Sequence, residues 1–218
     1  MIVYTCVFGD TDRLQEPLVK TQARLICFTD QPIQSKGWGI IRVDKLEAPK
    51  RECRKYKQRP YTVFPGESVT LWIDAPFALR VDPLVLAQKY PGEMTAFVHD
   101  KRKRITDECE AIIRAGKALP EAVRAQLAAY KADGFDTDHD PQKKIHNGGA
   151  LLRRHTSRME EFGERWHHEV QTRTLRDQMS IDYCASKIGL EINDFAGTVH
   201  QNPYFIRIAR REKPTNDY

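Results

Sequence analysis

The sequence predicts a single α/β domain with a parallel or mixed sheet flanked by helices. A length of 218 residues fits one large domain rather than two, and 40% hydrophobic residues suffice for one core. Apolar runs with β character fill the first half of the chain, and helical patterns dominate the second half. We expect the domain to cover residues 1–212 and a polar tail to follow over 213–218.

Five apolar runs in the first half are expected to form strands. Several are nearly continuous in Val, Ile, Leu, Phe and Cys, which is typical of strands buried on both faces of a sheet. The first run has neither the basic flank nor the cleavage site of a signal peptide, so it is expected to be a buried strand. The runs cover residues 2–8, 24–28, 39–43, 69–73 and 95–98.

Four helices are predicted from apolar residues at helical spacing and from their end signals. Pro120 fits the first turn of the second helix, and Gly189 fits the end of the last. The segment 133–149 is rich in Asp, Gly, Lys and His without periodicity, so we expect a loop of functional importance there. The helices are expected over about residues 106–115, 120–133, 157–170 and 175–188.

Composition limits the classes of protein to which the chain can belong. No apolar run approaches the roughly 20 residues of a membrane-spanning helix. The five cysteines are scattered without CxxC spacing, which favours a reduced, cytoplasmic protein without structural zinc. The net charge of +5 arises from local basic clusters, which either face a polyanion, line a phosphate site or are simply solvated.

The segment 71–76 is an apolar strand that ends abruptly in Asp74, just before the turn residue Pro76. Ligands of open α/β sheets bind outside the carboxyl ends of the strands, so Asp74 is expected at the mouth of a site. A carboxylate there can hold a divalent cation that bridges two phosphate groups. The alternative is an Asp that caps a turn.

Two further strand ends carry polar or turn residues. These are the end of the first strand, from Tyr4 and Thr5 to Phe8 and Gly9, and the end of the second, at Asp30. Such positions can supply contacts to a nucleotide base and ribose, or they are ordinary transitions from strand to loop.

Basic residues are concentrated just before the fourth strand. Arg54 and Lys57 belong to this concentration, and cations there can neutralise a diphosphate or remain solvated. His99 and Arg102 follow the fifth strand. The glycines of Asn147-Gly148-Gly149 permit a close approach of a ligand to the backbone.

Asp177 lies where the last predicted helix begins, between Arg176 and Gln178. A carboxylate at this place is either a helix-capping acid or a functional group. Of the seven histidines, His155 and His200 are the candidates for metal or phosphate ligands. No P-loop, GxSxG, HExxH or GxGxxG fingerprint is present.

Seven stretches, taken in order, resemble the TOD/MUCI-type glycosyltransferase-like family. They span about residues 3 to 185, and their shared order is more specific than any single motif. The stretches are VYTCVFGD (3–10), ICFTD (26–30), RECRKYK (51–57), LWIDAPFALRVDP (71–83), FVHDKRKRITDE (97–108), NGGALLRRH (147–155) and WHHEVQTRTLRDQMSIDY (166–183).

The resemblance implies a GT-A-like fold, with a mixed, mostly parallel sheet, and transfer of a hexose or pentose from a nucleotide-diphospho-sugar. It implies that Asp74 binds the metal, Mn²⁺ or Mg²⁺, and that Arg176, Asp177 and Gln178 face the donor sugar or the acceptor as catalytic residues. Many GT-A enzymes carry a DxD pair, whereas Asp74 is followed by Ala75 and Pro76, so the second carboxylate is absent. Asp82 or a histidine, such as His200, can complete the metal coordination, or basic residues can replace the cation.

The expected donor is a UDP- or GDP-sugar, held by a larger set of residues from the strand ends, the basic segment and the glycine pair. The sugar, the acceptor, the anomeric outcome and the oligomeric state are left open. The expected donor-binding residues are Tyr4, Thr5, Phe8, Gly9, Asp30, Arg54, Lys57, Trp72, His99, Arg102, Asn147, Gly148 and Gly149.

Two other functions compete with this interpretation. The first is a glycosyltransferase of phage type that acts on modified nucleic acid, which the basic clusters favour. The second is a nucleic-acid binder, non-catalytic or nuclease-like, that uses the same clusters and the loop rich in His and Asp.

Overall fold

A computed structural model of the chain describes residues 1–9, 12–135 and 144–208. Asp10, residues 136–143 of the predicted functional loop and the predicted polar tail lie outside these ranges. The strands are β1 (Ile2–Val7), β2 (Arg24–Thr29), β3 (Gly39–Arg42), β4 (Val69–Ile73), β5 (Phe77–Leu79), β6 (Met94–Val98), β7 (His146–Arg154), β8 (Ile192–Thr198) and β9 (Phe205–Arg207).

Seven α-helices and one 3-10 turn are found among the described residues. Pro49, Pro83 and Pro120 each open a helix, where the missing N–H of proline costs nothing. The helices are α1 (Pro49–Gln58), α2 (Pro60–Val63), α3 (Pro83–Lys89), α4 (Ile105–Arg114), α5 (Pro120–Ala132), α6 (Ser157–Thr172) and α7 (Ile181–Lys187), and the turn is η1 (Asp177–Met179).

The main sheet has seven strands in the order β3-β2-β1-β4-β7-β6-β8. Only β7 runs antiparallel to its neighbours β4 and β6, and the other pairs are parallel. The predicted α/β class with a mixed, mostly parallel sheet is therefore confirmed, as are strands in all five predicted apolar runs. β5 and β9 form a separate two-stranded antiparallel sheet.

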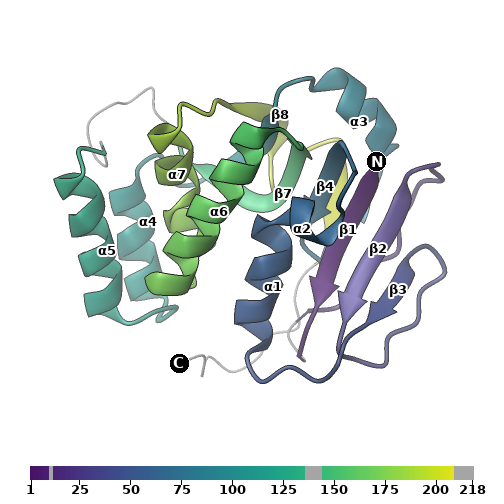
Figure 1. Cartoon of the computed structure of the whole chain (residues 1–218), viewed down its shortest axis with the longest axis horizontal. Helices are drawn as coiled ribbons and strands as arrows, with labels where there is room; N and C mark the ends of the chain where they lie inside the picture. Colours follow the sequence, from purple (N-terminus) through teal and green to yellow (C-terminus); the bar gives the residue numbers. More distant parts are fainter. Residues whose placement is uncertain (10–11, 136–143, 209–218) are drawn as a thin grey trace.

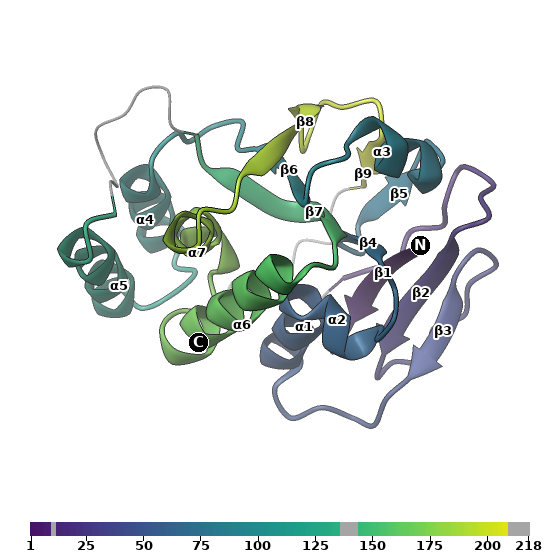
Figure 2. The ribbon, with the colours of Figure 1, turned by 45° about the horizontal axis from the view of Figure 1, so that its top comes forward.

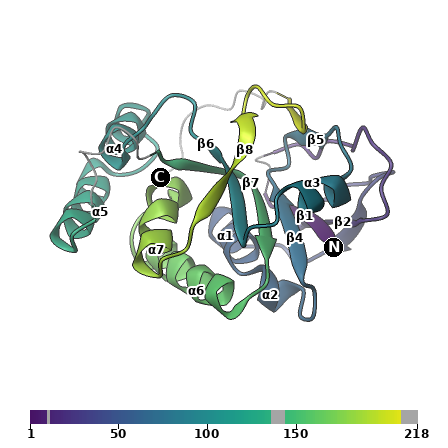
Figure 3. The same ribbon diagram turned by 90° about the horizontal axis from the view of Figure 1, so that it is seen from above.

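Two apolar cores lie on opposite faces of the sheet, because residues of a strand point alternately to either side. Ile2, Tyr4 and Cys6 of β1 belong to the core that contains α6 and α7, whereas Val3 and Val7 belong to the core with α3 and β5. Figures 1 and 3 show α1, α2 and α6 covering one face and α3 lying over the other. Figure 2 shows α4 and α5 beside the sheet.

Two predicted elements need correction. Residues 146–149 were expected in a loop, but they begin β7, because this segment pairs with β6 at Phe97 and Val98. The helix expected over 175–188 is divided into η1 and α7, which meet at Ser180, whose hydroxyl and backbone N–H both donate to the carbonyl of Asp177. Met179 is nevertheless fully buried, as its place in the apolar stripe predicted.

No helix among the described residues combines the length and apolar character that a membrane crossing requires.

Candidate active site

The predicted site residues gather along one edge of the main sheet. Because β1, β2, β4, β6 and β8 run parallel, their carboxyl ends meet at this edge, and the antiparallel β7 begins there. We call it the carboxyl edge. Sequence reasoning anticipated this grouping for Gly9, Asp30, Asp74 and His99, each of which directly follows a strand or lies within two residues of its end.

Asp74 follows β4 at the centre of this edge. Its backbone N–H donates to the carbonyl of Gly149 at 2.8 Å, and its own carbonyl accepts from Phe77 at 2.9 Å, so the backbone is fixed on both sides. The indole of Trp72 donates to Oδ1 of Asp74 at 2.9 Å. The carboxylate is therefore oriented by its own strand, and 29% of the side chain remains exposed.

Lys57 joins Asp74 to Asp177. The ammonium of this buried side chain donates to Oδ2 of Asp177 at 2.6 Å and lies 3.6 Å from Oδ1 of Asp74. It also lies 5.6 Å from the ring centroid of Trp72. Arg54, one turn earlier in α1, places a guanidinium nitrogen 3.4 Å from Oδ2 of Asp177 and donates to the carbonyl of Leu175. We call Arg54, Lys57, Asp74 and Asp177 the α1 cluster.

Asp177 is buried at 7% exposure and stays ionised. Burial alone would raise the pKa of its carboxyl, but the charges of Arg54 and Lys57 outweigh burial and hold the pKa well below its usual range. A general base must accept a proton near the operating pH, and a carboxylate held in this way is poorly suited to do so. Asp177 was expected to be a catalytic residue facing the donor sugar or the acceptor, and its two ion pairs favour a role in orienting Arg54 and Lys57.

Gly148 provides the space in which Lys57 reaches Asp177. A Cβ atom on Gly148 would lie 3.0 Å from the Lys57 ammonium and 3.5 Å from Oδ2 of Asp177. The neighbouring Gly149 donates to the side chain of Asn147 at 2.7 Å. The glycines were expected to let a ligand approach the backbone. In this structure, the absence of a side chain at Gly148 leaves space for the Lys57 ammonium.

The corner between β1 and β2 is held by Asp30, whose Oδ1 accepts from the N–H of Gly9 at 2.8 Å. Gly9 has a φ of 61°, which favours glycine. Tyr4, Thr5 and Phe8 were expected to contact a nucleotide. That expectation is corrected, because Tyr4 and Thr5 are 0% exposed and Phe8 is 2% exposed, so these side chains support the edge from within.

Trp72 was also expected to bind the donor. Its side chain is 1% exposed, and its hydrogen bond to Asp74 orients that carboxylate. Gln178, which follows Asp177 in η1, has a buried Nε2 that finds no hydrogen-bond partner within the described part of the chain. A ligand oxygen at that point would satisfy it. Arg176 is the residue before η1 and lies close enough to Asp177 to lower its pKa.

A second cluster of ionisable side chains lies where β6 ends. Nδ1 of His99 accepts from the backbone N–H groups of Lys101 and Arg102, at 3.0 and 3.1 Å. Arg102 donates to Glu108. Burial, assisted by the charge of Arg102, lowers the pKa of His99 to about 4, so the ring is neutral at physiological pH. We call His99, Asp100, Arg102 and Glu108 the β6 cluster.

His200 was expected to complete a metal site with Asp74. It lies in the exposed turn after β8, where Nε2 is 3.7 Å from Asp100, and it contacts Arg207. The alternative ligand Asp82 caps α3 by accepting from the N–H of Leu84. His155, the other candidate histidine, contacts Thr70 at the opposite end of β4. In the described ranges, no three His, Cys, Asp or Glu side chains form a cluster that could hold a metal.

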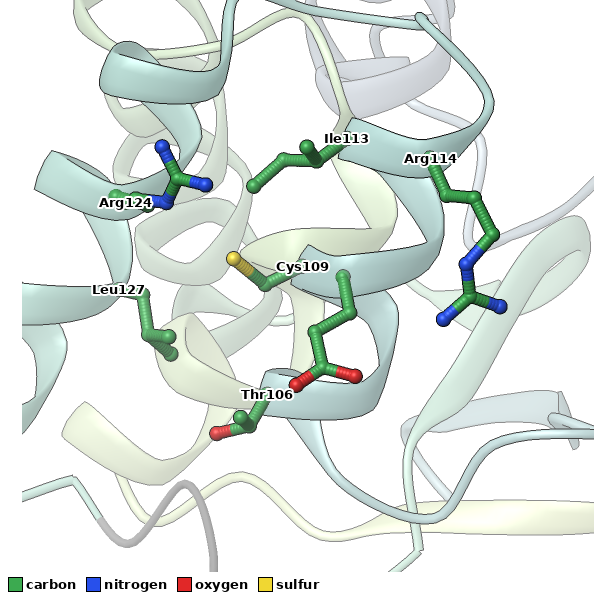
Figure 4. Close-up of a pocket in the computed structure, with 7 residues that line it drawn as sticks. Thr106, Cys109, Ile113, Arg114, Arg124 and Leu127 are labelled. Atoms are coloured by element: carbon green, nitrogen blue, oxygen red, sulfur yellow. The ribbon is translucent and has the colours of Figure 1, made fainter.

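A surface hollow of about 460 Å³ lies away from these residues, between α4 and α5. Figure 4 shows Cys109, Ile113 and Leu127 at its apolar centre, with Arg114 and Arg124 on either side. None of the predicted site residues lines it. The carboxyl edge, not this hollow, therefore carries the chemistry considered below.

Comparison with known proteins agrees with this geometry. A family model described as TOD1/MUCI70, glycosyltransferase-like domain, matches residues 33–206. The chain belongs to this family. All four residues of the α1 cluster and all four of the β6 cluster fall within the match, so both belong to the TOD1/MUCI70 domain rather than to an addition.

Two plant relatives of this TOD1/MUCI70 chain, both from Arabidopsis thaliana, carry different names. "Probable hexosyltransferase MUCI70" is 28% identical over 225 residues, which cover 88% of this chain and 38% of that protein. "Alkaline ceramidase TOD1" is 22% identical over 229 residues, which cover 88% of this chain and 49% of that protein. The chain thus spans less than half the length of either relative.

Sequence reasoning missed one important contributor to the site. Arg153 is fully buried in β7 and donates to the carbonyl of Lys57 at 2.6 Å. Because Arg154 follows it directly, Arg153 was counted among the local basic clusters of the sequence. A period of two within a strand places consecutive residues on opposite faces, and that was the available signal.

Proposed function

We propose that this chain transfers a sugar from a nucleotide-diphospho-sugar to a hydroxyl acceptor at the carboxyl edge. The observation that carries the proposal is the α1 cluster, in a chain of a glycosyltransferase-like family. Two cations and two carboxylates there occupy the place where ligands of α/β sheets bind.

The chemistry requires neutralisation of the diphosphate as its bond to the sugar breaks. Negative charge grows on the departing phosphate oxygens, and preorganised cations stabilise that charge without reorganising. Lys57 is only 2% exposed, so its ammonium, fixed by Asp177, would act on a diphosphate held at Asp74 through its charge at short range and not by direct contact. Arg54 supplies a second cation with 21% of its side chain exposed.

A divalent cation fits at Asp74 only in company with the donor. Both Trp72 and Lys57 approach Oδ1 of Asp74, so Oδ2 is the oxygen available for a metal. Mg²⁺ is commonly held by one or two carboxylates together with substrate phosphates. Mn²⁺ or Mg²⁺ bound there would act as a Lewis acid toward the diphosphate.

The remaining residues of the edge would hold the donor on either side of the diphosphate. The base and ribose of UDP or GDP would lie against the corner formed by Gly9 and Asp30. Gln178 and Arg176 in and before η1 would face the sugar, with Asn147 nearby at the start of β7. Asp177 would orient the cations rather than accept a proton.

Asp74→Ala tests the metal role directly. Transfer or hydrolysis of the donor should fall by about 10²–10³-fold, because an electrostatic group at the reacting phosphate is lost. The circular dichroism spectrum and melting temperature should stay close to wild type, and Asp44→Ala, a change at an exposed carboxylate of the loop after β3, serves as the control. Unaltered turnover of Asp74→Ala would remove this residue from the reaction.

A thermal-shift panel separates the transferase from its rivals. UDP or GDP with Mn²⁺ should raise the melting temperature, since a ligand that binds only the folded state stabilises it. Stabilisation by oligonucleotides alone, or acceptor binding that falls steeply with salt, would favour a nucleic-acid function. Because one relative is named a ceramidase, release of a sphingoid base from ceramide is measured in parallel, and such release without any nucleotide effect would replace the proposal.

A further inference from the structure

The guanidinium of Arg153 is buried beneath the α1 cluster. It is 0% exposed, donates to the carbonyl of Lys57 at 2.6 Å and donates to the hydroxyl of Tyr4. Its Nε has no hydrogen-bond partner among the residues that the structure describes, and no described carboxylate pairs with it.

Stability does not account for this arrangement. A buried charge loses its hydration, and the loss is repaid only by a good counter-ion and by complete hydrogen bonding. Arg153 has two neutral acceptors and one orphan donor, and burial lowers the pKa of its guanidinium. An apolar side chain of similar volume would avoid the cost of burying this charge, and would leave the Lys57 carbonyl without its donor, so the two effects on stability oppose each other.

The contacts of Arg153 instead fix the end of α1. Tyr4, which accepts from Arg153, donates to the carbonyl of Tyr56 at 3.1 Å. The carbonyls of residues 56 and 57 are therefore both held from the sheet. They belong to the last turn of α1, where carbonyls have no partner within the helix.

The direction of the Lys57 side chain depends on this anchor. Side chains of a helix lean toward its N-terminus, so the Lys57 side chain runs back from the last turn of α1 toward the carboxyl edge. It passes Trp72 and ends beside Asp177 under Gly148, where a Cβ would come within 3.0 Å. A small shift of the helix end would move the ammonium out of this narrow space.

We propose that Arg153 is a positioning residue. It holds the last turn of α1, so that the Lys57 ammonium lies between Asp177 and Asp74, where its charge would stabilise the diphosphate. The role in catalysis rests on the proposed function, whereas the positioning of the ammonium can be observed in the free protein.

Arg153→Met tests the proposal, with Arg154→Met as the matched control. Arg154 is the next residue of β7 and its guanidinium donates to carbonyls of Ala87 and Pro91, on the α3 side of the sheet. Both variants lose one positive charge and keep a long side chain. Only Arg153→Met removes the donors to Lys57 and Tyr4.

The readout is the heteronuclear NMR spectrum of the lysine ammonium groups without ligand, with the Lys57 signal assigned by its loss in Lys57→Met. A buried ammonium held by Asp177 exchanges slowly and gives a signal. We expect that signal in the wild type and in Arg154→Met, and its loss or shift in Arg153→Met at a nearly unchanged melting temperature. The Kd for UDP should also rise about tenfold in Arg153→Met alone.

An unaltered Lys57 signal in folded Arg153→Met overturns the inference. If that variant does not fold, Tyr4→Phe replaces it, because this change keeps the charge of Arg153 and removes the donor to the carbonyl of Tyr56. An unaltered Lys57 signal in Tyr4→Phe then overturns the inference, and a shifted one supports it. If the wild type fails to bind any nucleoside diphosphate while the signals behave as expected, the proposed function fails and the positioning role stands.

Discussion

Beside α1, the carboxyl edge carries a buried carboxylate, Asp177, that neighbouring cations keep ionised, whereas at the end of β6 it carries a histidine that burial keeps neutral. In the α1 cluster, Lys57 and Arg54 lie 2.6 and 3.4 Å from the same oxygen of Asp177. In the β6 cluster, Nε2 of His99 lies 3.9 Å from Glu108, whose oxygen is already bound by Arg102. Asp177 and His99 are both buried, yet Asp177 is charged and His99 is neutral.

The difference follows from the partners that each group finds. Burial disfavours a charge in both places, but two cations overcome it at Asp177, and at His99 the cation Arg102 reinforces it. Burial likewise raises the pKa of the Glu108 carboxyl. Asp177 is therefore expected to keep its charge across the physiological pH range, and His99 and Glu108 to respond to acid.

Lys57→Met should produce the largest effect and would break the α1 cluster. Loss of the ammonium removes charge stabilisation at the diphosphate, so transfer should fall by about 10²–10³-fold. The melting temperature should fall as well, because the buried Asp177 loses the cation that lies 2.6 Å from its Oδ2. Donor turnover and thermal unfolding are measured on the same preparation.

Two controls separate activity from stability. Lys55→Met removes an exposed cation of the same helix that pairs with Glu52, and it should behave as wild type. The double variant Lys57→Met with Asp177→Asn removes both charges, so it should regain melting temperature without regaining transfer. A double variant that recovers both properties would show that Lys57 serves the fold only.

Gly148→Ala should have a smaller effect on the same cluster. The added Cβ would lie 3.0 Å from the Lys57 ammonium, so the ammonium must move away from Asp177. We expect a loss of about tenfold in transfer and an increase in the Kd for UDP, since small displacements of a positioned group are costly. Gly39→Ala in β3 is the control, because its Cβ would meet only the carbonyl of Leu25 at 3.4 Å. Equal rates for the two variants would contradict the tight fit under Gly148.

Much of the fold was accessible from the sequence because its signals are local. The run at 69–73 is apolar and ends at Asp74, and a strand with a carboxylate at its end is what the structure contains. The strand β7 was partly missed because it begins with His146, Asn147 and two glycines, residues with low strand propensity. Pairing with β6 and β4 overrides that propensity.

The candidate site was accessible only in part because its contacts are long-range. Lys57 and Asp177 are separated by 120 positions, and no periodicity relates them. Tyr4 looked like a ligand residue because it precedes a strand end, but alternation within β1 turns it into the core beneath α1. Alternation within β7 separates Arg153 from Arg154, but the contact of Arg153 with the carbonyl of Lys57 joins residues that are 96 positions apart.

His99→Asn should have the smallest effect and would sharpen the contrast in pH response. The pKa of His99 is lowered to about 4 in the folded chain, against about 6.5 for an unfolded histidine. Between those values the unfolded state binds the extra proton, so the stability of the wild type falls as pH falls from 6.5 toward 4. An asparagine oxygen can still accept from the N–H groups of Lys101 and Arg102, and it does not titrate.

The melting temperature of His99→Asn should therefore decline less steeply than that of the wild type over this pH window. Each kcal/mol of stability corresponds to about 2–4 °C for a chain of this size. Burial also lowers the pKa of His155 to about 4, and this histidine contributes to the pH dependence of stability in both proteins. The slope of melting temperature against pH should therefore become smaller in His99→Asn but not fall to zero. If the melting temperatures of the two proteins fall in parallel from neutral pH to pH about 4, folding does not lower the pKa of His99, and the proposed difference between the two clusters is contradicted.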